Sequence, residues 1–117
     1  MSIDTFITKD SGERQVFETG MVRDSAIKAL RPDLVDQTML QRWAELMGRG
    51  AAKYGERNWE KAATQAELDR FHASAYRHFF QWFNGLNPEE DHASAVFFNI
   101  AGAEMVKAKL KAKIEGK

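Results

Sequence analysis

Two helices joined by a very short connection place the strongest constraint on how this chain can fold. Thr64 and Glu67 have the spacing of a capping box, in which a hydroxyl and a carboxylate satisfy backbone N–H groups reciprocally, and they predict a helix over 65–84. The connection 85–87 begins with a glycine, which commonly ends a helix, and Pro88 is typical of the first position of the next one. Because the connection is so short, the two helices are expected to lie antiparallel and side by side.

Apolar residues recur every three or four positions in three segments, which predicts an all-α fold with three main helices. The first helix is expected over 37–54 and the third over 88–113, with Asn87 as the N-cap of the third. The helix dipole favours a solvated last turn that carries Lys107, Lys109, Lys111 and Lys113. The residues expected to face inward are Met39, Leu40, Trp43, Leu46, Met47 and Tyr54 in the first helix, Leu68, Phe71, Ala75, Phe79, Trp82 and Phe83 in the second, and Val96, Phe97, Ile100, Ala103 and Val106 in the third.

The helix at 65–84 carries more aromatic surface than one inward face needs. Tyr76 and Phe80 lie away from the centre of its apolar stripe, where a second element or a second subunit would cover them. We therefore expect a small helical bundle of about three main helices with an irregular N-terminal arm. A second subunit is expected to complete the bundle, as a homodimer or a higher homo-oligomer.

Length and composition bound the remaining choices. The 117 residues favour one helical domain, placed at 16–117 after a flexible N-terminus at 1–15. Lys and Arg balance Asp and Glu at 17 each, which argues against a general nucleic-acid or membrane binder. The absence of cysteine excludes disulfides, thiolate metal sites and cysteine nucleophiles. No signal peptide or bilayer-length apolar run is visible, so a cytoplasmic protein is expected.

The segment Lys53–Trp59, at the end of the first helix, contains cations and aromatic rings on both sides of Gly55. Lys53 and Arg57 can hold phosphate, the arginine in a bidentate manner. Tyr54 and Trp59 offer flat faces on which a base can stack, and Asn58 adds a carboxamide. The alternative is a helix terminator with a solvated charge cluster and a buried tryptophan.

A second group of polar residues falls where the second and third helices meet. Arg77 and His78 lie late in the second helix, and Asp91 and His92 lie early in the third. Asn99 is seven residues beyond His92 and therefore shares its helix face. A His-Asp-His cluster could bind a divalent metal, and the same residues could equally form a capping and hydrogen-bond network.

Four runs of the sequence resemble a largely phage-borne family, the dATP/dGTP diphosphohydrolase N-terminal domain family. The resemblance covers most of the chain, and the Lys-Tyr-Gly-x-x-Asn-Trp block and the Arg-His pair are its most specific pieces. If the chain is phage-encoded, its expected location is the host cytoplasm. The four runs are Phe17–Asp24, Gly50–Lys61, Tyr76–His78, and Asp91–His92 with Asn99.

The resemblance implies cleavage of a purine deoxynucleoside triphosphate to the monophosphate and pyrophosphate. It also implies kinship with the MazG-type all-α NTP pyrophosphohydrolases, which are helical bundles that form oligomers and use Mg²⁺. The residues assigned to the phosphate groups of the nucleotide are Arg23, Lys53, Arg57 and Arg77. Those assigned to the other parts of the nucleotide are Tyr54, Asn58, Trp59 and Asn99. The residues assigned to catalysis, and to Mg²⁺ or Mn²⁺, are Glu45, His78, Asp91 and His92.

One departure from the MazG pattern leaves the function open. MazG-type enzymes hold Mg²⁺ with Glu-x-x-Glu and Glu-x-x-Asp pairs on facing helices, and the predicted helices contain neither pair. Asp33 and Asp36 have the spacing but precede the first helix. Either the metal site is a mixed carboxylate–histidine site, or the chain binds a nucleotide or a nucleotide-derived signal without cleaving it. A helical protein-interaction module with the surplus aromatics as its interface is the third alternative.

Overall fold

The computed structural model describes residues 14–24 and 30–116 and separates the chain into two compact units, 1–35 and 36–117. The flexible N-terminus predicted at 1–15 falls almost entirely outside the described residues. The side chain of Arg23, a predicted phosphate contact, also lies outside them, and only its backbone is described.

The first unit contains a short β-hairpin. Strand β1 (Arg14–Val16) pairs antiparallel with strand β2 (Val22–Asp24). Between the strands the Gly20 N–H donates to the Phe17 carbonyl at 2.8 Å, with Gly20 at a φ of 88° that glycine adopts without steric cost. A 3₁₀ turn, η2 (Pro32–Leu34), follows later in this unit.

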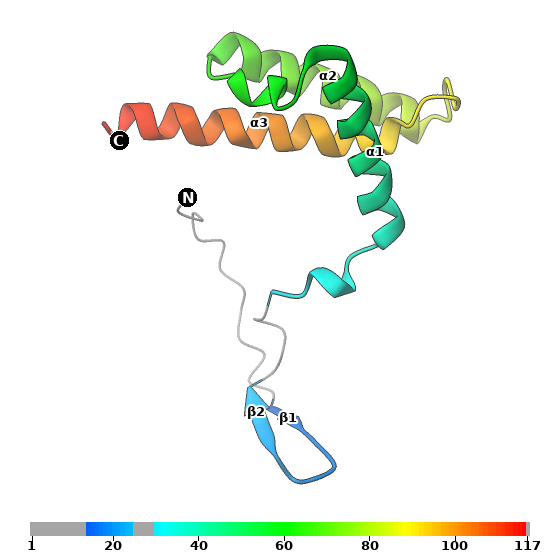
Figure 1. Cartoon of the computed structure of the whole chain (residues 1–117), viewed down its shortest axis with the longest axis vertical. Helices are drawn as coiled ribbons and strands as arrows, with labels where there is room; N and C mark the ends of the chain where they lie inside the picture. Colours follow the sequence, from blue (N-terminus) through cyan, green and yellow to red (C-terminus); the bar gives the residue numbers. More distant parts are fainter. Residues whose placement is uncertain (1–13, 25–29, 117) are drawn as a thin grey trace. The chain divides into compact units, whose positions relative to one another are not determined.

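The second unit is all-α, as predicted. Helices α2 and α3 run antiparallel and pack along each other, and α1 also contacts α3 (Figure 1). None of the described helices is long and apolar enough to cross a membrane. The elements of this unit are α1 (Gln37–Tyr54), the 3₁₀ helix η3 (Asn58–Lys61), α2 (Gln65–Phe83) and α3 (His92–Ile114).

The ends of the first two helices follow their capping residues. Asp36 caps α1 by accepting a hydrogen bond from the Thr38 N–H at 3.2 Å, and Gly55 ends α1 with a φ of 93°. The predicted capping box of α2 is present, because Thr64 accepts from the backbone of Glu67 and Glu67 accepts from the backbone of Thr64. Capping residues in the local sequence therefore determine where α1 and α2 begin and where α1 ends, as predicted.

The predicted start of the third helix is wrong. Helix α3 begins at His92, and its N-cap is Asp91, whose carboxylate accepts from the Ser94 N–H at 3.2 Å. Asn87 adopts a left-handed backbone with a φ of 47°, so the chain makes a turn after it where a helix was expected. Asp91 is the N-cap in place of Asn87 because the Ser94 hydroxyl also donates to the Asp91 carboxylate, at 2.7 Å.

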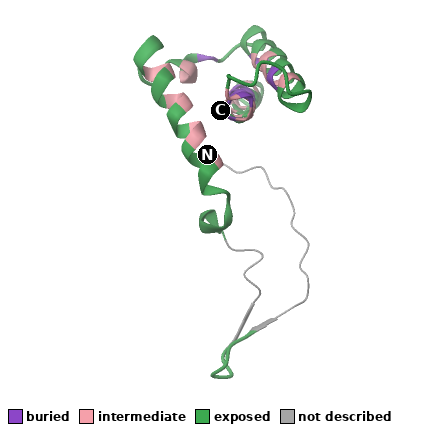
Figure 2. Cartoon of the chain, turned by 90° about the vertical axis from the view of Figure 1, so that its right-hand side faces the viewer, coloured by how far each residue is buried: buried purple, intermediate pink, exposed green. Residues whose placement is uncertain are grey.

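Buried positions of α3 are coloured purple in Figure 2, and apart from Val106 they are small or polar residues. The predicted inward positions Phe97 and Ile100 are exposed, and so are Phe79, Trp82 and Phe83 of α2. The positions of large apolar side chains predict the inward faces of the helices. In the structure, the helices meet instead through small residues that allow close approach. The buried residues of α3 are His92, Ser94, Ala95, Asn99, Gly102, Ala103 and Val106, and those of α2 are Leu68 and His78.

The two helices approach closely where the ring of Phe71 in α2 lies over Gly102 in α3. A Cβ at Gly102 would overlap the edge of that ring, so the ring occupies the space that any other residue would fill. Phe71 cannot turn away freely because it also packs edge-on against Phe98, with ring centroids 6.0 Å apart.

We expect Gly102→Ala to lower the free energy of unfolding by about 1–3 kcal/mol, the usual cost of overpacking. Gly48→Ala in α1 is the matched control, since Gly48 is also helical but has open space around its Cβ position. It should be neutral or stabilising by up to about 1 kcal/mol, through helix propensity. Urea denaturation of both variants measures the difference, and equal stabilities would contradict the close packing of α2 on α3.

Lys109 departs from the predicted solvated lysine row. Its ammonium donates to the carbonyls of Glu60 and Ala62, the latter at 2.8 Å, at the end of η3. The side chain therefore ties the segment between α1 and α2 to α3.

Candidate functional site

A pocket of about 680 Å³ opens in the helical unit beside the C-terminal half of α1. Residues of the segment after α1, the first turns of α2, and Phe98 of α3 complete its walls. This volume lies within the range of roughly 300–1,000 Å³ that is typical of small-molecule sites. The segment predicted to bind a nucleotide contributes Lys53, Tyr54, Arg57, Asn58 and Trp59 to the lining.

The lining of this cationic pocket is strongly positive. Its five cations are Arg49, Lys53, Arg57, Lys61 and Arg70, and its one carboxylate is Glu67. That carboxylate is already engaged in the capping box, accepting from the Ala63 N–H at 2.9 Å and the Thr64 hydroxyl at 2.8 Å. These hydrogen bonds, first of all the one from the Ala63 backbone, lower the pKa of Glu67.

Most of the cations remain available to a ligand. Arg57 pairs with the half-buried Glu60 at 2.7 Å, and the pair is weak because the Arg57 side chain is largely exposed to water. Among the residues that the structure describes, Arg49, Lys61 and Arg70 form no ion pair. A ligand with several negative charges would therefore be attracted without breaking a strong internal pair.

Four aromatic rings contribute to the apolar part of the pocket, beside aliphatic side chains such as Leu46 and Met47. Phe98 meets Trp59 edge-to-face, with centroids 6.0 Å apart and planes 79° apart. It meets Phe71 in the same way, at 6.0 Å and 78°. At the rim, the Lys53 ammonium lies 5.1 Å from the centre of the Tyr54 ring. The pocket therefore combines aromatic surface with cationic side chains.

The backbone between α1 and α2 turns sharply to place these side chains. Arg57 itself adopts a left-handed conformation, with φ 58° and ψ 20°, which is uncommon for a residue with a Cβ. The turn is held by the Glu60 N–H, which donates to the Arg57 carbonyl at 3.1 Å, and by the Lys109 contacts on η3. The position of Arg57 at the pocket thus depends on tertiary contacts as well as on its neighbours.

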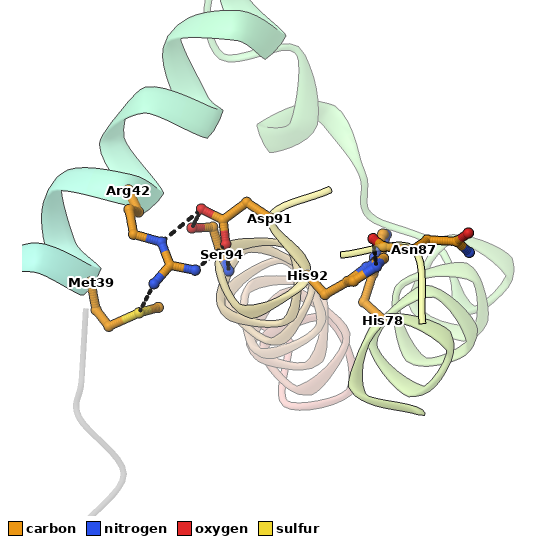
Figure 3. Close-up of polar contacts among 7 residues, drawn as sticks. All are labelled: Met39, Arg42, His78, Asn87, Asp91, His92 and Ser94. Atoms are coloured by element: carbon orange, nitrogen blue, oxygen red, sulfur yellow. Dashed lines mark hydrogen bonds and ion pairs between the residues drawn. The ribbon is translucent and has the colours of Figure 1, made fainter. Parts of the chain in front are cut away.

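Asp91, a predicted catalytic and metal-binding residue, forms an interhelical clamp (Figure 3). Its carboxylate accepts from Arg42 of α1 at 2.5 and 2.9 Å while it caps α3. The hydrogen bond from Arg42, and then those from Ser94, hold the pKa of Asp91 well below its usual range. Both carboxylate oxygens are therefore committed to stabilising the junction of α1 and α3.

His78 and His92 form a buried pair between α2 and α3, with their Nδ1 atoms 2.9 Å apart (Figure 3). Nε2 of His92 lies 3.0 Å from the Leu86 carbonyl and 2.9 Å from the Asn87 carbonyl. Because carbonyls only accept, this Nε2 carries a hydrogen, and Nδ1 of His92 then accepts from Nδ1–H of His78. Nε2 of His78 in turn accepts from Arg77, at 3.3 Å.

This hydrogen-bond chain is satisfied only with both imidazoles neutral. Burial first, and then the charge of Arg77, lowers the pKa of His78, while Glu90 opposes the shift and His92 adds to it. A histidine whose folded pKa lies below its unfolded value stabilises the fold above the unfolded pKa, and that stability is lost as pH falls.

We expect the free energy of unfolding to decrease as pH falls below about 6.5, the ordinary pKa of histidine, and the His78→Gln variant to show a flatter decrease. The control variant is His72→Gln, which removes an exposed histidine that is not part of the buried pair. Denaturant midpoints at several values of pH between 5 and 8 provide the measurement. Identical slopes for wild type and His78→Gln would contradict the neutral pair.

The remaining predicted site residues lie apart from the pocket lining. Glu45 is exposed and accepts from Gln41 at 3.2 Å, and Asn99 is buried, donating to the Ala95 carbonyl at 2.8 Å. Within residues 14–24 and 30–116, no group of three or more His, Asp or Glu side chains is placed to hold a metal ion. Glu45, His78, Asp91 and His92 are therefore not gathered into one metal site.

Several residues that line the pocket are not predicted from the sequence. Arg49 and Arg70 are cations on α1 and α2, and Lys61 follows Arg57 by four residues. Arg49 lies four residues before Lys53, a spacing that puts two cations on one helix face, and this was the available signal. Arg70 and Phe98 gave no such signal, because only folding brings α2 and α3 to the pocket.

Fold and site together define an all-α unit with a pocket that is lined by five cations and four aromatic rings. The chain belongs to the family of the dATP/dGTP diphosphohydrolase N-terminal domain, whose model matches residues 19–113. No curated protein and no solved structure matches the chain.

Proposed function

We propose that the cationic pocket binds a purine deoxynucleoside triphosphate and that the protein cleaves it to the monophosphate and pyrophosphate. The observation that carries this proposal is the coincidence of five cations with aromatic walls in one pocket. The family to which the chain belongs supports the choice of dATP and dGTP as substrates.

The cations suit a triphosphate. At neutral pH the triphosphate carries several negative charges, and Arg and Lys side chains form charge-assisted hydrogen bonds with phosphate oxygens. Lys53 and Arg57 lie on the same segment, and Arg49 and Arg70 add planar donors from α1 and α2. These groups would also stabilise the charge that develops on the departing pyrophosphate, which is the main contribution a protein makes to such a reaction.

The apolar walls suit the base. Trp59 and Tyr54 lie on the same segment as Lys53 and Arg57, and a purine offers a larger stacking surface than a pyrimidine. The carboxamide of Asn58 can donate to and accept from the edge of a base. A nucleotide would thus lie with its phosphates on the cations and its base against the rings.

Among the described residues no group of three or more His, Asp or Glu side chains is placed to hold Mg²⁺ or Mn²⁺. Hard cations prefer several oxygen ligands, whereas the one carboxylate of the pocket is engaged by Thr64 and Ala63. In the proposal the triphosphate therefore enters as its complex with Mg²⁺ or Mn²⁺, as part of the substrate, and the chain supplies the binding groups.

A second candidate function is binding without cleavage, for example sequestration of a nucleotide or of a nucleotide-derived signal. The observation that favours it is the engagement of the predicted catalytic groups with other parts of the chain. Asp91 is bound by Arg42 and Ser94, and His78 and His92 are bound to each other.

The two functions are separated by measuring pyrophosphate release from each of the four dNTPs, alongside equilibrium binding of the same nucleotides. We expect release from dATP and dGTP in Mg²⁺ or Mn²⁺ and none in the presence of a chelator. Tight binding without release in any metal would select the sequestering function. If no dNTP binds, both assignments of the pocket are wrong.

A further inference from the structure

Gly102 lies directly behind the wall of the cationic pocket. This glycine is buried in the middle of α3 and is not one of the residues that line the pocket. The ring of Phe71, which does line the pocket, lies over it. Phe71 is half-buried, so it contacts Gly102 and still contributes surface to the pocket. The ring therefore separates the glycine from the pocket.

The position of the Phe71 ring requires a glycine at 102. A Cβ atom there would lie 2.6 Å from Cζ and 2.7 Å from Cδ1 of Phe71. Carbon atoms in contact are about 3.5–4.0 Å apart, so the ring would have to withdraw by roughly 1 Å. No other glycine that the structure describes has a neighbour within 4 Å of its Cβ position. Glycine is unfavourable inside a helix, and here it makes room for a ring of the pocket wall.

The surroundings of Phe71 determine where a displaced ring would go. Phe71 packs against the buried core cluster that includes Leu68 and Val106. It also meets Phe98 edge-to-face, with ring centroids 6.0 Å apart. Packed interiors contain little free space, whereas the pocket in front of the ring is open. A ring pushed away from Gly102 therefore moves into the pocket and reduces its depth.

From these contacts we propose that Gly102 is a positioning residue, which sets the depth of the cationic pocket through Phe71 and thereby admits a purine base. This role rests on the proposed binding of a purine deoxynucleoside triphosphate. With the phosphates on the cations, the base lies against the aromatic wall, and Phe71 is the part of that wall that adjoins the core. A purine is longer than a pyrimidine by one fused ring, so it reaches deeper. A shallower pocket therefore penalises the purine more.

Gly102→Ala tests this role through the ratio of purine to pyrimidine affinity, which a loss of stability alone does not change. Titration calorimetry on the full chain gives Kd for the α,β-imido analogues of the four dNTPs, which bind without being cleaved. For the folded variant we expect Kd to rise by about 10-fold or more for the two purine nucleotides, as for one methylene too many in a tight pocket, and by less than about 3-fold for the two pyrimidine nucleotides. Circular dichroism measures the folded fraction.

A second substitution supplies the rescue. Leucine lacks the Cε1 and Cζ atoms of the phenyl ring, two of the three atoms that a Cβ at Gly102 would overlap. The double variant Gly102→Ala/Phe71→Leu should therefore fold and recover the purine preference. Gly48→Ala is the matched control, because Gly48 is helical, lies outside the pocket lining and has open space around its Cβ position. It should retain the wild-type Kd for all four nucleotides.

The outcomes separate the role of Gly102 from the proposed function. A wild type that binds none of the four analogues overturns the proposed function and this role with it. A wild type that binds purine and pyrimidine nucleotides equally overturns this role and leaves nucleotide binding in place. So does a folded Gly102→Ala variant with the wild-type preference. If Gly102→Ala does not fold, a double variant that recovers neither the fold nor the purine preference overturns the role as well.

Discussion

Replacing Lys53 and Arg57 together by alanine is expected to weaken nucleotide binding by about 2–4 kcal/mol, or roughly 30- to 700-fold in Kd. Both side chains line the cationic pocket, and each would lose a charge-assisted hydrogen bond to a phosphate oxygen. The pocket would retain three of its cations, so residual binding should persist. Titration calorimetry with dATP and dGTP measures the change in Kd.

The matched control replaces two lysines of α3 that lie outside the pocket lining, Lys107 and Lys113, by alanine. The net charge changes by the same amount, so any loss of affinity in the control reports only the long-range field, which salt screens. Equal affinity loss in the two double variants would assign Lys53 and Arg57 to a solvated surface.

Asp91→Ala should lower the free energy of unfolding by about 2–4 kcal/mol, from a lost helix cap and a lost charge-assisted hydrogen bond. Its carboxylate holds Arg42 of α1 and caps α3, so two helices lose a shared attachment. The Asp91 pKa is held below its usual range, so this stabilisation is present above the ordinary carboxyl pKa of about 4 and is lost as pH falls further. Acid unfolding therefore separates this effect from that of the histidine pair.

Asp36→Ala is the control for this substitution, because Asp36 caps α1 but no interhelical ion pair to it is found in the described part of the chain. Removing a cap alone should cost about 1 kcal/mol, so the excess loss in Asp91→Ala measures the attachment to Arg42. Asp91 lies outside the cationic pocket, and folded Asp91→Ala protein should retain its affinity for nucleotide. If the Asp91→Ala variant were as stable as the Asp36→Ala variant, the contact between Asp91 and Arg42 would not contribute to the stability of the fold.

Five residues singled out in the sequence line the cationic pocket, and they do so together because they are neighbours in the chain. Lys53, Tyr54, Arg57, Asn58 and Trp59 lie within one turn region, and any compact turn there keeps them close. The assignment of the polar residues of α2 and α3 could not be made in the same way. Whether a carboxylate binds a metal, a helix end or an arginine depends on which helix faces it, and that is a tertiary property.

The sequence by itself determined where α1 and α2 begin and end, because caps, glycines and periodicity act over a few residues. Only the tertiary structure decided which faces of α2 and α3 meet. Large aromatic rings in the sequence predict a different contact face. In the structure Gly102 and Ala103 lie on the buried side of α3, because the Phe71 ring occupies the space that Gly102 leaves. The competing choice, with Phe79 and Phe83 inward, has the same helical period, and only the fit of side chains between helices distinguishes the two.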